Sequence, residues 1–241
     1  MSRRLMNRSR TREYYLLCFF LRAAAFCLLV WYAITAPEAF LADLSAPRGL
    51  TPLTLVWLAL MVSMALRLLP SRRESLGCQK KYDARFRPTG SLPAPEDLRA
   101  ANRGAAKSAL LWIAANLCFF LLFAKGWLGR RFLVCLAGFY GVCDIFCILF
   151  YCPFQSWLMH NRCCTTCRIF NWDHLMMFSP LIFLNSFYAR SLVAMAAAVF
   201  LVWEITLRRH PERFLESTNL ALRCGSCTDR LCSHGKKLQS D

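Results

Sequence analysis

Apolar residues fill long stretches of this chain, and polar residues gather between them. An α-helix needs about 20 apolar residues to cross a bilayer. Runs close to this length predict four membrane-spanning helices, at about 14–35, 52–69, 109–124 and 132–151. The first run is longer than the 7–15 apolar residues of a typical signal peptide, so we interpret it as an uncleaved helix. The pattern predicts an all-α integral membrane protein.

The apolar stretch at 175–207 is too long for a single membrane-spanning helix, and Arg190 interrupts it. Two short, closely connected helices, at about 175–187 and 191–207, fit the stretch better. With these two, we expect a polytopic bundle of about six transmembrane helices.

Three polar segments separate or follow the predicted spans. The loop at 70–108 is rich in proline, and Pro95 with the acidic residues after it predicts a helix that continues into the third span. A second loop, at 152–174, is rich in cysteine. We therefore divide the chain into a transmembrane domain, 1–207, and a tail, 208–241. Pro211 and a one-sided set of apolar residues predict that the tail opens with an amphipathic helix along the membrane surface.

The net charge of +16 could suggest nucleic-acid binding, but the distribution of charge argues against it. Twenty-three of the 30 Lys and Arg residues lie in 1–13, 70–108, 152–174 and 208–241. Basic residues concentrate on the cytoplasmic side of membrane proteins. We thus expect a multi-pass protein of the cell (inner) membrane with both termini in the cytoplasm. Its predicted partner is the lipid bilayer, not nucleic acid.

Many of the 14 cysteines are grouped in two clusters, which this topology places on the cytoplasmic face. Stable disulfides are rare in the reducing cytoplasm, so metal binding or thiol chemistry is expected instead. The candidate metal ligands of the loop are Cys152, His160, Cys163, Cys164 and Cys167. Those of the tail are Cys224, Cys227, Cys232 and His234.

Two metals fit this composition. Three cysteines and His234 in the tail match the Cys3His sets of structural zinc. An all-cysteine set drawn from both clusters would suit an iron–sulfur cluster. The predicted tail helix could carry Cys224 towards Cys164, so one centre could be shared between loop and tail.

Asp144 lies midway along the fourth predicted span, where an acidic residue is costly. It could serve a solute or proton path, or it could be hydrogen-bonded to Asn116 or Asn185 of a neighbouring helix. Glu204 has a simpler interpretation, since Arg208 is four residues further along the same predicted helix.

The chain contains no Walker loop, Rossmann glycine pattern or His-Glu-x-x-His motif. The leading hypothesis is a membrane protein with a Cys-ligated zinc or iron–sulfur centre on its cytoplasmic face, structural or electron-transferring, with an unidentified membrane redox or protein partner. The alternatives are a metal-free thiol–disulfide oxidoreductase that uses Cys164 and Cys167, and a small-solute or proton-coupled transporter that uses Asp144. Whether the protein is an enzyme stays open at this point.

Overall fold

The computed structural model describes residues 2–45, 49–68, 76–82, 85–161 and 163–226. Within these residues the chain is helical, apart from turns, loops and one isolated bridge between Pro88 and Asn219. Four helices are long and apolar enough to cross a membrane, which confirms the predicted class. They are α1 (Ser2–Thr35), α5 (Pro95–Ala124), α6 (Arg130–Leu149) and α8 (Phe187–Arg209). The apolar helix α3 (Pro52–Leu68) is shorter.

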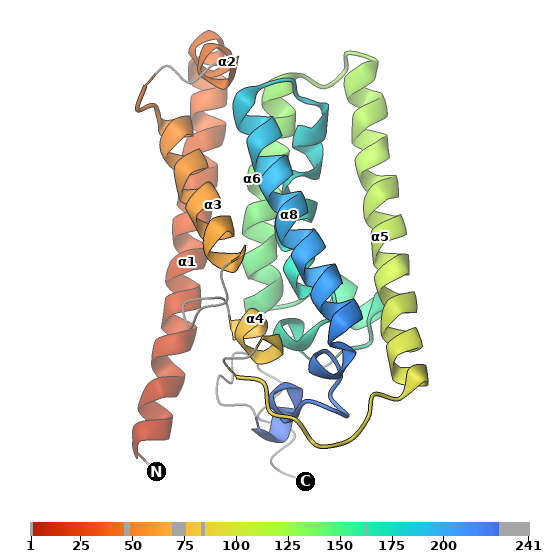
Figure 1. Ribbon diagram of the computed structural model, residues 1–241. Helices are drawn as coiled ribbons and strands as arrows, with labels where there is room; N and C mark the ends of the chain where they lie inside the picture. The colour runs from red at the N-terminus through yellow and green to blue at the C-terminus, as the bar shows by residue number, and fades with distance from the viewer. Residues whose placement is uncertain (1, 46–48, 69–75, 83–84, 162, 227–241) are drawn as a thin grey trace.

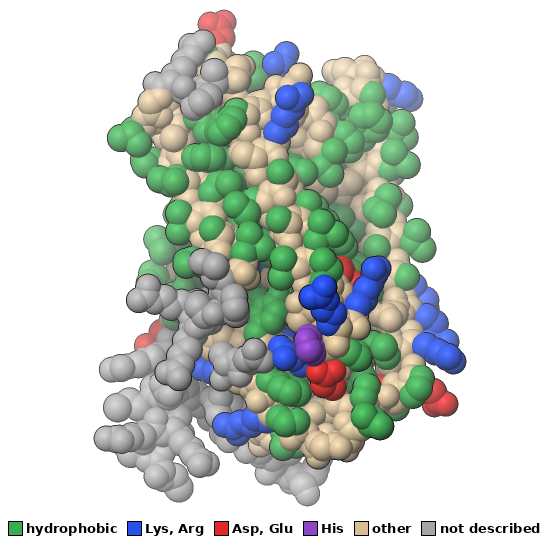
Figure 2. Space-filling model, viewed as in Figure 1, with side chains coloured by type: hydrophobic (Ala, Val, Ile, Leu, Met, Phe, Trp, Pro, Cys, Tyr) green, Lys and Arg blue, Asp and Glu red, His purple; other side chains and the backbone are tan. Residues whose placement is uncertain are grey.

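The long helices stand side by side in one bundle, with α6 and α8 near its centre and α5 at one side (Figure 1). The short helix α2 (Pro37–Ser45) lies at one end of the bundle. At the opposite end, the start of α1, the short helix α4 (Leu76–Lys81) and the end of α8 lie together. Hydrophobic side chains cover much of the bundle in Figure 2, and more Lys and Arg side chains appear toward the α4 end.

Helix α5 forms as the sequence predicts. It begins at Pro95 and has Glu96 and Asp97 in its first turn. Proline suits the first helical position because its missing N–H has no intrahelical partner there. The helix then runs without a break to Ala124, so the polar loop supplies the first half of a membrane-spanning helix.

The predicted helix at 175–187 is not present. The chain instead forms the short helix α7 (Asp173–Phe178) and the 3-10 helix η4 (Ser179–Phe183), which pack against α6 and α8. Pro180 explains this break, because proline lacks the N–H that an α-helix needs. The Ser186 Oγ accepts a hydrogen bond from the Ala189 N–H and caps α8, which therefore starts before Arg190.

The prediction that the tail opens with an amphipathic helix is also wrong. Three 3-10 turns replace it: η5 (Pro211–Arg213), η6 (Leu220–Leu222) and η7 (Cys224–Ser226). Asn219 accounts for the difference, since its Nδ2 donates to the carbonyls of Lys80 and Arg213, both at 2.8 Å. Such side-chain bonds to the backbone compete with helix formation.

Two hydrophobic cores hold the molecule together. One lies among α1, α2, α3, α6, α7 and α8. The other lies at the α4 end of the bundle, around the fully buried Trp203. The Trp203 ring contacts Tyr82 and Phe214, and its Nε1 donates to the Arg168 carbonyl at 2.8 Å. This second core packs α4, the cysteine-rich loop and the start of the tail onto the bundle.

Candidate thiol site at the end of helix α6

Three thiols from separate parts of the chain meet where α6 ends. Cys147 lies in the last turns of α6, Cys152 follows the helix, and Cys164 begins the 3-10 turn η2 (Cys164–Thr166). The Cys164 Sγ donates a hydrogen bond to the Cys147 carbonyl at 3.2 Å, and all three side chains line one cavity. All three are present as thiols rather than disulfides. We call Cys147, Cys152 and Cys164 the thiol cluster.

The local sequence explains why Cys152 turns towards these partners. α6 ends at Leu149, and Cys152 precedes Pro153, a position that disfavours helical backbone. The chain then enters a single π-helical turn, η1 (Phe154–Leu158). There the Gln155 N–H points at the Cys152 Sγ at 3.5 Å, while the Cys164 Sγ lies 3.1 Å from the Gln155 Oε1.

The thiols of the cluster are chemically unequal. The neighbouring Cys147 and Cys164 side chains, with further help from the backbone, hold the pKa of Cys152 well below its usual range despite its burial. The reverse holds for Cys164, because the nearby Cys152 and burial raise its pKa. Of the two, Cys152 is the thiol that loses its proton more easily. A thiolate, not a thiol, is the nucleophilic form of cysteine.

The thiol cluster lines a cavity of about 580 Å³. Cys143, one helical turn before Cys147, also lines it, as their i,i+4 spacing predicts. Most other lining side chains are apolar, and many are aromatic. The aromatic residues are Trp112, Phe139, Tyr140, Phe146, Tyr151, Phe154, Trp157 and Phe170.

The other predicted ligands of the loop lie outside the thiol cluster. The Cys163 Sγ lies 3.1 Å from the Thr165 Oγ1. Cys167 is buried, lines the cavity and has its carbonyl bonded by the Lys81 Nζ. His160 is exposed and has a positive φ of 48°.

Only one predicted ligand of the tail, Cys224, lies within the described residues, in η7. Cys227, Cys232 and His234 lie outside them. Across the parts of the chain that the structure describes, no three His, Cys, Asp or Glu side chains are placed to hold a metal ion. The described cysteines thus do not fit a zinc or iron–sulfur centre by themselves, and we derive no step through a metal. The zinc or iron–sulfur centre stays a prediction from the sequence.

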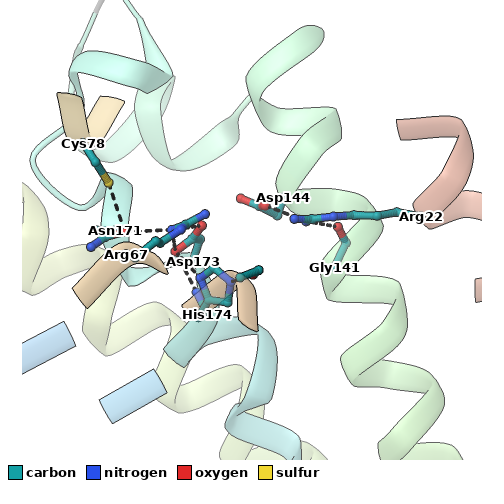
Figure 3. Close-up of polar contacts among 9 residues, drawn as sticks. Arg22, Arg67, Cys78, Gly141, Asp144, Asn171, Asp173 and His174 are labelled. Atoms are coloured by element: carbon teal, nitrogen blue, oxygen red, sulfur yellow. Dashed lines mark hydrogen bonds and ion pairs between the residues drawn. The ribbon is translucent and has the colours of Figure 1, made fainter. Parts of the chain in front are cut away.

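Asp144 takes part in an ion pair that the sequence analysis missed (Figure 3). The Arg22 Nη1 on α1 donates to the Asp144 Oδ2 and to the Gly141 carbonyl, both at 2.9 Å. The expected amide partner is occupied elsewhere, since Asn116 Oδ1 accepts a bond from the Ser179 Oγ at 3.0 Å. An arginine within a predicted span was the signal for this pair, because intramembrane charges usually pair with one another.

A second ion pair joins α3 to the start of α7. The Arg67 Nη1 lies 2.6 Å from the Asp173 Oδ2 and donates to the Asn171 Oδ1 at 2.7 Å (Figure 3). The Asp173 Oδ1 also lies 3.0 Å from the His174 Nδ1. Asp173 therefore binds an arginine of another helix.

Glu204 pairs with Arg168, not with the expected Arg208. Two guanidinium nitrogens of Arg168 each donate to a carboxylate oxygen of Glu204 at 2.7 Å, and the Trp172 Nε1 donates a third bond at 2.7 Å. A bidentate pair of this kind is stronger than a single contact between exposed side chains. It fixes the cysteine-rich loop, which contains Arg168, onto α8.

Comparisons with known proteins give no relative from which a role could be inferred. No family model matches the chain, and neither a curated protein nor a solved structure matches it. The function must therefore be argued from the residues of the site.

Proposed function

We propose that this protein is a membrane-embedded thiol–disulfide oxidoreductase in which Cys152 and Cys164 alternate between a dithiol and a disulfide. The observation that carries the proposal is the meeting of three thiols in one cavity, where the Cys164 Sγ bonds to the Cys147 carbonyl and the Gln155 N–H points at the Cys152 Sγ. A stabilised thiolate favours the reduced form, which makes the corresponding disulfide a good oxidant. The protein would then oxidise thiol substrates.

Cys164 is the better disulfide partner of the two neighbouring thiols. Cys147 belongs to α6 and is held by its helical backbone. Cys164 lies in a loop whose regular structure near it is one short 3-10 turn. A loop can adjust to the narrow geometry of a disulfide more easily than a helix can. Cys147 keeps the role of a neighbouring side chain that lowers the pKa of Cys152.

The proposed reaction is an exchange of two electrons between thiols. A substrate thiolate attacks the Cys164 sulfur of the Cys152–Cys164 disulfide, and Cys152 leaves as the stabilised thiolate, since a thiol of lower pKa leaves faster. A second substrate thiolate attacks the substrate sulfur of the mixed disulfide. Cys164 then leaves and takes up a proton, as its raised pKa favours. The substrate becomes a disulfide, and the protein becomes a dithiol.

Thiol counting on the purified protein tests this proposal. One equivalent of a small aromatic disulfide should remove two thiols from the reduced protein, and dithiothreitol should restore them. Cys152→Ser should abolish this reversible loss. Cys163→Ser, a neighbour of Cys164 outside the thiol cluster, should leave it unchanged. A loss of two thiols that persists in Cys152→Ser would contradict the proposal.

The proposal extends to the arrangement of the chain in the membrane. Six crossings, with both termini in the cytoplasm of the cell (inner) membrane, are supported by the concentration of Lys and Arg in four segments. On this topology the thiol cluster faces the cytoplasm. Disulfides of cytoplasmic proteins are usually transient and catalytic, which agrees with a redox role.

A metal centre in the tail is a second proposal, supported by spacing alone. Cys224, Cys227, Cys232 and His234 have the composition of a Cys3His zinc site. Elemental analysis of anaerobically purified protein tests it. About one zinc per chain, lost on replacement of Cys227 by Ser, is the expected result, and protein without bound metal would contradict it.

A further inference from the structure

The cavity beside the thiol cluster has a composition suited to a particular class of ligand. Its lining combines thiols with aromatic rings on several sides, among them Trp112, Tyr140 and Phe154. The Trp112 ring contacts the other two, with centroid distances of 4.6 Å to Tyr140 and 5.8 Å to Phe154. Aromatic side chains prefer to pack against other flat rings. A volume of about 580 Å³ lies within the usual range for small-molecule sites.

The charges around the cavity argue against an anionic ligand. Among the residues that the structure describes, neither Lys nor Arg lines it, so a phosphate group would find no cationic partner among them. The two acidic residues of its lining, Asp144 and Asp173, are paired with Arg22 and Arg67. The cavity therefore suits an uncharged ligand.

The cavity is open on the side of the bundle surface. Phe139 and Phe146, which lie on the membrane-spanning helix α6, are 47% and 44% exposed. Trp157, from the turn after α6, is 68% exposed. Because residues of a membrane-spanning helix that are exposed on the bundle face lipid, a lipid-soluble molecule could enter between these side chains.

We propose that this cavity binds a membrane-soluble quinone, which oxidises the Cys152–Cys164 dithiol. The inference rests on the proposed thiol chemistry and supplies its electron acceptor. A quinone is flat, uncharged and lipid-soluble, and it accepts two electrons. In the reaction, a bond forms between the two sulfurs, and the quinone takes up two electrons and two protons to become a quinol. The thiol of Cys164 supplies one proton, and the solvent replaces the one that Cys152 has lost. The protein would thus pass electrons from thiol substrates to the quinone of the bilayer.

The experiment uses the full chain in detergent and a fully substituted benzoquinone with a short alkyl tail as the probe. Such a ring has no free position at which a thiol could add. Anaerobically reduced protein should convert one equivalent of quinone to quinol, measured by absorbance, and lose two thiols. The intact protein should lose two hydrogen atoms in mass and gain no adduct.

A cavity-filling variant links the reaction to the site. Cys143→Phe places a ring in the cavity without changing the thiol cluster, so quinone reduction should slow by about tenfold or more while oxidation by a small disulfide continues. Cys118→Phe, at an exposed position of α5 that does not line the cavity, is the matched control and should react like the wild type.

The outcomes separate this inference from the function on which it rests. Quinone reduction that Cys143→Phe blocks and Cys118→Phe does not would support it. Two-thiol oxidation by the small disulfide without quinone reduction would overturn the quinone inference alone, and the cavity would then be a place for lipid chains. Failure of the dithiol to form a disulfide with either oxidant would overturn both proposals.

Discussion

At the scale of single residues, the chemistry of the site depends on which thiol carries a charge. The side chains of Cys147 and Cys164 lower the pKa of Cys152. Polar groups that interact with the charged form of a residue favour that form. Of these two neighbours, the sequence pointed only to Cys164. Cys147 was not among the candidates because a cysteine inside an apolar helix is usually a packing residue.

The charge on Cys152 predicts an unusual pH dependence of its alkylation. A thiol of ordinary pKa reacts faster as pH rises towards its pKa of about 8.5. Cys152 should instead react with iodoacetamide at a nearly constant rate between about pH 5 and 8, because its pKa lies below this window. Mass spectrometry of the alkylated peptides measures the rate at each position.

A substitution separates the contribution of Cys147 from the effect of the cavity as a whole. Cys147→Ala removes a neighbouring thiol, so the pKa of Cys152 should rise and its reactivity at low pH should fall about tenfold for each pKa unit. Cys143→Ala changes another thiol of the same cavity that is not bonded to Cys152 and should leave the profile in place. An unchanged profile in Cys147→Ala would show that the Cys147 side chain does not set the charge.

At the level of elements, partly or largely buried ion pairs connect segments that are distant in sequence. The pair of Arg22 and Asp144 joins α1 to α6. A second pair, Arg67 and Asp173, joins α3 to α7. A third, Arg168 and Glu204, joins the cysteine-rich loop to α8. A charge in a membrane interior is stable only when it is paired or hydrated. These pairs therefore fix the relative positions of the elements that surround the thiol cluster.

The pair of Arg22 and Asp144 makes a testable contribution to stability. Asp144→Asn leaves the half-buried guanidinium of Arg22 without its counter-charge, which should destabilise the protein by roughly 1–3 kcal/mol. Circular dichroism of the protein in detergent, recorded during heating, measures this change as a lower midpoint temperature of unfolding.

The matching double variant shows whether the cost comes from the unpaired charge. Arg22→Met with Asp144→Leu removes both charges and should recover most of the lost stability, because apolar side chains of similar volume often replace a buried ion pair without loss. If the double variant is as unstable as Asp144→Asn, the pair is not the source of the effect.

Local sequence signals predicted some elements and failed at others for identifiable reasons. The proline and acidic residues at the start of α5 act within one turn, so its start was predictable. The tail failed because Asn219 bonds to Lys80, a residue 139 positions away, and such a contact leaves no periodic pattern. The sequence predicted three of the cavity's cysteines as site residues, namely Cys152, Cys164 and Cys167. It could not predict that Cys164 lies beside Cys147 and Cys152, because this depends on how the loop after α6 returns to that helix.

At the scale of the whole molecule, the side of the membrane that the thiol cluster faces decides which substrates reach it. The start of α1, the cluster-bearing loop and the end of α8 lie at the same end of the bundle (Figure 1). The basic residues concentrate in the segments at this end. In the proposed topology, which rests on the positive-inside rule, this end faces the cytoplasm.

Cysteine labelling with an impermeant reagent measures the topology. Cys78 is unsuitable as a reporter because it is fully buried. Ser91 and Lys125 are exposed and lie at opposite ends of α5, so they form a matched pair. Relative to the wild type, Lys125→Cys should gain label in intact cells, whereas Ser91→Cys should gain it only after permeabilisation. Labelling of Ser91→Cys from outside would invert the topology and expose the site to an oxidising compartment.

Peptide mapping of the oxidised protein shows whether Cys152 and Cys164 form the proposed disulfide. Protein oxidised by a stoichiometric small disulfide is alkylated, digested without reduction and analysed by mass spectrometry. The predicted result is one major cross-linked peptide that joins Cys152 to Cys164 and disappears after treatment with dithiothreitol. A cross-link that excludes Cys152, such as one between Cys163 and Cys224, with Cys152 recovered as an alkylated thiol, would contradict the account.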